Sequence, residues 1–162
     1  MHNPTQYFTH SLTNLTKILT KAEAYAEAKK IKPEVIPQLR LIADMLPLWR
    51  QITIASDHAK GASARLAGLP VPPFEDNETT LAELITRIQK TIDFLATIPS
   101  GAYEGAEGLE ISLRVGGRDI TMEALRYYHS YAVPNFFFHM TTAYNILRAN
   151  GVDVGKSDFI DA

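Results

Sequence analysis

Apolar residues spaced three and four positions apart run without a break through residues 37–66, and this spacing is the strongest constraint on the fold. The stripe consists of Leu41, Met45, Leu48, Ile52, Ala55, Ala59, Ala62 and Leu66. Ile42, Leu46 and Ile54 lie off the stripe, so the helix is apolar around much of its circumference. The pattern predicts a helix from Pro37 to Leu66, kinked at Pro47, that is central in a bundle or faces a partner chain.

Three further segments show helical spacing. Residues 4–30 form one amphipathic pattern, and residues 80–95 form another that begins with the capping-box pair Thr80 and Glu83. Between helices two and three, the prolines of residues 69–78 exclude helix and predict an extended connection. The last helix is expected from Thr121 to Ala149, broken or bent at Pro134, with residues 152–162 as a tail over the surface.

A short β-hairpin is expected before the last helix. Residues 110–115 alternate between polar and apolar, Gly116 and Gly117 follow, and a second run begins at Arg118. Two glycines between such runs are typical of a two-residue hairpin turn. The fold class predicted from these elements is all-α, a four-helix bundle with one short β-hairpin before the last helix.

Composition narrows the function class. The 162 residues suit a single domain over 1–162, and the formal net charge of −2, without a run of like charge, argues against nucleic acid as a partner. The absence of cysteine removes disulfides and thiolate chemistry. Neither a signal peptide nor a membrane span is indicated, so we expect a cytoplasmic protein that has no membrane partner.

Polar residues beside the apolar stripes are the candidates for a functional site. Gln51, His58 and Arg65 recur every seven residues with Asp44, so the four share one flank of helix two. His139 lies on a flank of the last helix, and it would meet His58 in one cleft if these two helices are neighbours. Such a polar column can line a pocket or form a solvated flank.

Two histidines alone do not complete a metal site. A catalytic zinc site usually takes three protein ligands and a water. His129 precedes His139 by ten residues, which is about 15 Å of rise on a continuous helix. Asp57 or Asp44 could supply a carboxylate, but no spacing selects either residue. No recognised catalytic motif assigns a catalytic residue.

Three consecutive phenylalanines, residues 136–138, favour an oligomer. They span about 200° of a helix surface, so at least one ring must meet the hairpin, another element or a second chain. Together with the wide apolar girth of helix two, the triplet predicts a homodimer.

The segments IASDHAKGASARLAGLPVPPFEDNETTLAELITRI and VPNFFFHMTTAYNILRANGVDVGKSDF closely resemble a family of bacterial proteins of unknown function within the DinB/YfiT-like superfamily. The resemblance implies a four-helix bundle, commonly dimeric, of a type that often holds a divalent metal. In such superfamily members, the three metal ligands are a histidine on helix two and a His-x-x-x-His pair on the last helix. His58 matches the first approximately and His139 could match one member of the pair. Asn135 and Ala143 stand where the second member would be.

Two functions follow as alternatives. The favoured one is a homodimeric small-molecule-binding scaffold that lacks the full three-histidine site and needs no cofactor. Its pocket would be lined by Trp49, Gln51, His58, Asn135 and His139. The alternative is a divalent-metal-dependent transferase or hydrolase, with His58 and His139 binding Zn²⁺, Ni²⁺ or Mn²⁺ and a third group completing the shell. Whether the protein is an enzyme stays open at this point.

Overall fold

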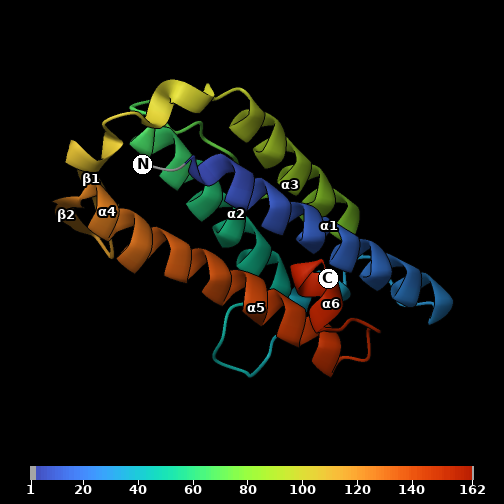
Figure 1. The fold of residues 1–162 in the computed structure, drawn as a ribbon. Coiled ribbons are helices and arrows are strands. Elements are labelled where there is room, and N and C mark those ends of the chain that lie inside the picture. The colour runs from blue at the N-terminus through green and yellow to red at the C-terminus, as the bar shows by residue number, and fades with distance from the viewer. Residues whose placement is uncertain (1–2, 162) are drawn as a thin grey trace.

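The structure is a computed structural model that describes residues 3–161, and it is mostly helical (Figure 1). Its long helices are α1 (Pro4–Ala28), α2 (Leu48–Leu66), α3 (Leu81–Ala96) and α5 (Val133–Ala149). The shorter elements are the 3₁₀ turns Ile36–Gln38, Ser100–Tyr103 and Ala106–Gly108, strands β1 (Glu110–Val115) and β2 (Arg118–Glu123), helix α4 (Ala124–Tyr127), a π-helical segment (Tyr128–Ala132) and helix α6 (Lys156–Ile160). The helical fold with one hairpin agrees with the prediction, although a simple count of four helices omits α4 and α6.

The long helices share one apolar core. Helix α2 packs against α5 and α3, and α1 packs against α3. Fully buried side chains come from all four long helices and include Phe8, Leu12, Leu15, Ile52, Ala59, Leu84, Ile88, Phe136 and Met140. Helix α2 is therefore central, because it contacts the helices on two sides of the core.

Helix α2 begins later than the apolar spacing predicts. Residues 36–38 form a 3₁₀ turn and residues 39–47 are irregular, so the predicted helix from Pro37 was wrong at its beginning. The cause is Pro47, which lacks an N–H and disfavours helix at the residue before it. Pro47 therefore stands at the N-cap of α2 and does not kink it. Asp44 consequently lies on the loop and does not share a flank with His58.

The start of α3 follows the predicted capping box. The Thr80 hydroxyl accepts a hydrogen bond from the Glu83 backbone N–H at 3.3 Å, and a Glu83 carboxylate oxygen accepts one from the Thr80 N–H at 2.9 Å. The helix ends at Ala96, before Pro99, as expected. Residues 69–78 contain neither helix nor strand, and the prolines there exclude helix.

The hairpin has the predicted register and turn. Strands β1 and β2 are antiparallel, with Val115 opposite Arg118 and Glu110 opposite Glu123. Gly116 and Gly117 both have positive φ, of 56° and 81°, a conformation that side chains disfavour and that this turn requires. The hairpin packs on the core through Ile111, which is 5% exposed.

The last helix is interrupted where Pro134 was expected to break it. The strand β2 continues to Glu123, so the helix does not begin at Thr121. A π-helical turn over 128–132 comes immediately before α5, and Pro134 is the second residue of α5. A proline inside a regular α-helix lacks one donor and collides with the carbonyl four residues earlier, and the widened turn before it relieves this conflict.

The three phenylalanines divide among three environments. Phe136 is buried against Phe8, with ring centroids 4.9 Å apart, and Phe137 meets Tyr7 of α1 at 5.5 Å. Phe138 is 57% exposed. The expectation that one ring meets another element is therefore satisfied by Phe137 within this chain.

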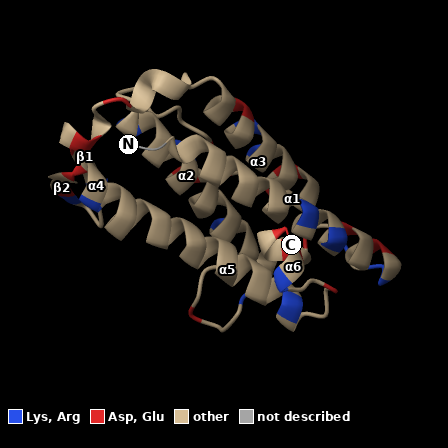
Figure 2. Ribbon diagram, viewed as in Figure 1, with Lys and Arg blue, Asp and Glu red and all other residues tan. Residues whose placement is uncertain are grey.

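The C-terminal tail forms the short helix α6 against α1. Lys21 of α1 pairs with Asp158 at 2.7 Å, and Lys17 pairs with Asp161 at 2.8 Å. In the view of Figure 2, most of α5 carries no charged position, and basic and acidic positions appear at the hairpin and around α6. Over residues 3–161, no helix combines the length and apolarity that crossing a membrane would need.

Candidate functional site

His58 of α2 and His139 of α5 lie side by side. Their ring centroids are 6.2 Å apart and the ring planes differ by 14°. The contact exists because small side chains, Ala59 and Ala62 on α2 and Ala143 on α5, are fully buried in this core. Helices approach more closely where the residues between them are small. The sequence predicted that these histidines would meet if their helices were neighbours, and the two rings lie next to each other.

Gln51 fixes the orientation of the His139 ring. Its side-chain N–H₂ donates to the Leu46 carbonyl at 2.9 Å, so its oxygen is the atom 2.7 Å from Nδ1 of His139. That oxygen can only accept, and Nδ1 must therefore carry the proton. The consequence is that Nε2 of a neutral His139 has a free lone pair.

Both imidazoles are held neutral at pH 7. Burial is the main cause that lowers the pKa of His58 to about 4. The charges of His139 and Arg65 lower it too, and Asp57 opposes them. Burial, with a contribution from Arg50, also lowers the pKa of His139. Burial disfavours the charged form of an imidazole because the surrounding protein solvates charge poorly.

Two tyrosines and an arginine form a chain of contacts that begins at His58. The Tyr131 ring lies 5.6 Å from His58 and 5.9 Å from Tyr127, measured between centroids. Nη1 of Arg65 donates to the Tyr127 hydroxyl at 3.3 Å. Sequence reasoning missed both tyrosines, because they lie at or within the π-helical turn, where the rotation per residue of an α-helix does not apply.

Trp49 and Asn135, the other residues predicted for the pocket, do not join this arrangement directly. Trp49 is half-buried, and its ring lies 5.1 Å from the Arg50 guanidinium. Asn135 donates to the backbone carbonyl of Tyr131 at 2.7 Å, so its amide is engaged by its own helix. Neither residue makes a ring contact or a hydrogen bond with His58 or His139 in the part of the chain that the structure describes.

The donor set does not fit a three-histidine metal site. No three side chains of His, Cys, Asp or Glu within residues 3–161 gather closely enough to hold an ion. His129 is exposed on the π-helical segment. Asp57 is occupied by Lys60 at 3.0 Å and Arg87 at 3.1 Å. His58 and His139 could offer two nitrogen ligands, and the described residues supply no third.

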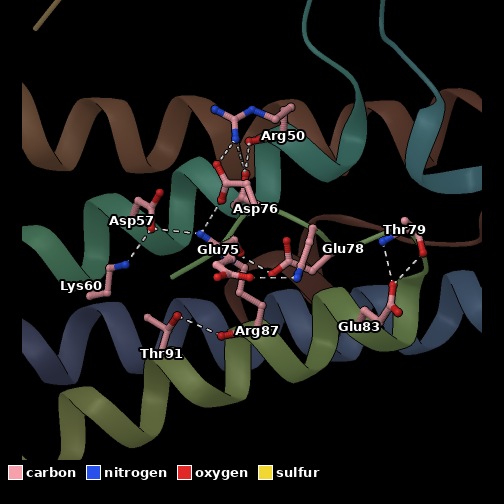
Figure 3. Close-up of polar contacts among 12 residues, drawn as sticks. Arg50, Asp57, Lys60, Glu75, Asp76, Glu78, Thr79, Glu83, Arg87 and Thr91 are labelled. Atoms are coloured by element: carbon pink, nitrogen blue, oxygen red, sulfur yellow. Dashed lines mark hydrogen bonds and ion pairs between the residues drawn. The ribbon is translucent and has the colours of Figure 1, made fainter. Parts of the chain in front are cut away.

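A second polar cluster joins α2, α3 and the extended connection (Figure 3). The Arg87 side chain, 2% exposed, pairs with Asp57 at 3.1 Å, Asp76 at 2.9 Å and Glu78 at 2.9 Å. It also donates to the Glu75 carbonyl at 2.8 Å. A buried charge with this many acceptors is compensated, so the cluster fastens the connection to the bundle.

The surface beside this cluster is hollowed. A hollow of about 580 Å³ is lined by Phe74, Asn77, Thr86, Arg87 and Lys90, among others. Its charged groups are engaged within the chain, although Oε2 of Glu78 and Nε of Arg87 are buried without a hydrogen-bond partner among the described residues. Arg87 has three carboxylates, and the Lys90 ammonium lies over the Phe74 ring at 4.2 Å. We therefore place the candidate site at the histidines.

Comparison with known proteins identifies the family. The model of a domain of unknown function, DUF1993, matches residues 3–160. A crystal structure of a DinB family member from Shewanella denitrificans is 42% identical, with a TM-score of 0.90, and the match covers 98% of this chain and 89% of that one. Comparison with curated proteins gives no match. The chain therefore belongs to the DUF1993 family, within the DinB-like superfamily.

Proposed function

We propose that the protein is a single-domain, homodimeric small-molecule-binding module whose ligand site is the His58–His139 pair. The observation that carries this proposal is the pair itself, two nearly parallel imidazoles 6.2 Å apart that burial keeps neutral. Gln51 holds one of them in a single tautomer. A site that needs no third histidine agrees with the donor set of this chain.

The chemistry of the site suits hydrogen bonding to an organic ligand. A neutral imidazole has one donor and one acceptor nitrogen. Because Nδ1–H of His139 donates to the Gln51 side-chain oxygen, Nε2 is the ring atom that can accept a hydrogen bond from a ligand. The ring of Tyr131, beside His58, offers an apolar face to the body of such a ligand.

Exposed apolar side chains support the homodimer. Phe138 on α5 is 57% exposed, and on the loop before α2 Ile42 is 59% and Leu46 44% exposed. A contiguous exposed apolar patch often marks a protein–protein interface, and a homodimer would cover these side chains. Analytical ultracentrifugation of the wild type and of Phe138→Ser tests this part, and a wild-type protein that stays monomeric at high micromolar concentration would refute it.

The binding site is tested by NMR with ¹⁵N-labelled histidine rings and a library of small polar fragments. We expect saturable shifts of the His58 and His139 signals, lost in His139→Ala. The matched control is His129→Ala, which removes an exposed histidine and should bind like the wild type. If no fragment moves either ring signal, or if both variants bind equally, the site is elsewhere.

The second candidate is a divalent-metal-dependent transferase or hydrolase that uses His58 and His139. One observation favours it: Gln51 orients His139 through Nδ1 and leaves Nε2 free, as residues behind metal-bound histidines commonly do. Elemental analysis of untagged protein purified without chelator separates the candidates. Metal near one equivalent that is lost in His139→Ala would support the enzyme, and metal-free protein that still binds fragments would support the binding module.

A further inference from the structure

Arg65 turns back along its own helix toward the histidine pair. A side-chain carbon at Gly61, one turn earlier on α2, would collide with Nη1 of Arg65. The absence of a side chain at Gly61 is therefore what lets the guanidinium lie along α2, where it donates to the Tyr127 hydroxyl at 3.3 Å. The Tyr127 ring contacts the Tyr131 ring, which in turn contacts the His58 ring.

The positive charge of Arg65 has no carboxylate partner among residues 3–161. The other arginines that are not exposed, Arg50 and Arg87, each pair with Asp76. The neighbours of Arg65 are the Tyr127 phenol and, further along, the imidazole of His58, whose protonation the Arg65 charge opposes. A partly buried charge without a partner is unfavourable, and a bound anion would remove that cost.

We propose that Arg65 recognises an oxyanion group, a carboxylate or a phosphate, on the small molecule that binds at the His58–His139 pair. This role of Arg65 rests on the proposed function, and it specifies that the ligand carries an oxyanion group. The planar guanidinium presents paired N–H donors that match the two oxygens of such a group. The Tyr127 hydroxyl, on a side chain that is 1% exposed, accepts from Arg65 and so helps to hold the guanidinium in place.

The test is an NMR titration of the full-length protein at fixed pH and ionic strength. The probes are sodium benzoate and inorganic phosphate in separate experiments, with sodium chloride as the reference salt. We expect saturable shifts of the Arg65 side-chain N–H signal and of the His58 and His139 ring signals. Arg65→Met should weaken the affinity at least tenfold, and Arg65→Lys, which keeps the charge without the paired donors, should weaken it less.

The matched control is Arg126→Met, which removes the same charge from an exposed position on α4. It should titrate like the wild type. Saturation by benzoate alone assigns a carboxylate, and saturation by phosphate alone assigns a phosphate. Equal affinities of Arg65→Met and the wild type, or no saturable shift with either anion, would overturn the proposal. If neutral fragments still move the histidine signals in that case, the proposed function stands and only the role of Arg65 fails.

Discussion

Two neighbouring residues of α2, Asp57 and His58, belong to polar clusters of opposite character. Asp57 pairs with Arg87 of α3 in a cluster where one buried cation has three carboxylates (Figure 3). His58 stacks on His139 of α5, in a site of neutral rings beside an arginine that lacks a carboxylate. In the first cluster Arg87 and its three carboxylates pair with opposite charges, although Oε2 of Glu78 and Nε of Arg87 are buried without a hydrogen-bond partner within the described chain. In the second, the Arg65 charge has no carboxylate partner among residues 3–161. The difference separates a structural network from a candidate binding site.

The largest effect is expected from removing the Arg87 cation. Arg87→Met leaves Glu78 without a cation partner among residues 3–161, while Asp57 keeps Lys60 and Asp76 keeps Arg50. We expect a loss of about 3–5 kcal/mol in the free energy of unfolding. Urea denaturation measures it, with Arg126→Met as a control expected to lie within about 0.5 kcal/mol of the wild type. A loss below about 1 kcal/mol would show that the Arg87 cluster does not hold the connection.

Mild acid should act on the histidine site in particular. An unfolded His58 binds a proton near its ordinary pKa of 6.5, whereas the folded one stays neutral until about pH 4. The unfolded state therefore binds more protons in this window, and stability falls as pH falls from 6.5 toward 4. We expect a loss of roughly 2–3 kcal/mol, partly reduced because His58 keeps some contact with solvent.

The pH effect is measured by urea denaturation between pH 7 and 4.5, in the wild type and in His58→Gln. The carboxylates with lowered pKa, such as Glu83 and Asp158, lose their contribution only at lower pH. The variant should show a flatter dependence over this range, and the part that remains is due to His139, whose pKa is also lowered by burial. Parallel curves for the two proteins would contradict a neutral, buried His58.

Gln51 offers a way to disturb the site without touching a histidine. Gln51→Leu leaves the Nδ1 proton of His139 and the Leu46 carbonyl without their partner, at a cost of about 1–3 kcal/mol. The ¹⁵N shifts of the His139 ring should also show a mixture of tautomers in place of one. A single Nδ1-protonated tautomer that persists in the variant would mean that another group orients the ring.

The smallest effect on stability is expected at Gly61. Alanine favours helix by about 1 kcal/mol over glycine, so Gly61→Ala should leave the free energy of unfolding unchanged or slightly raised. The added methyl group must nevertheless displace the Arg65 guanidinium. We expect anion affinity to fall at least fivefold in a protein that is as stable as the wild type. Unchanged affinity would mean that Arg65 binds nothing from its present position.

Local signals in the sequence were enough for most of the fold. Thr80 with Glu83 located the start of α3, and Gly116 with Gly117 located the hairpin turn, because each pattern satisfies a specific backbone requirement. The start of α2 was missed because apolar spacing continued through residues 41–46, whereas Pro47 decided where the helix begins.

The candidate site was only partly predictable for a similar reason. His58 and His139 lie on regular helices, so a constant rotation per residue located their flanks correctly. Tyr127 and Tyr131 lie at or within the π-helical turn, where that rotation does not apply. The orientation of Arg65 depends on the space above Gly61, which residue spacing alone does not reveal.

A crystallographic fragment screen tests the central claim most directly, because it compares the two clusters in one experiment. Crystals of the protein would be soaked with small polar and carboxylate-bearing fragments at neutral pH. We predict fragments bound against His58 and His139, with acid groups directed toward Arg65. Fragments found only in the hollow beside Phe74 and Arg87, and none at the histidines, would contradict the account.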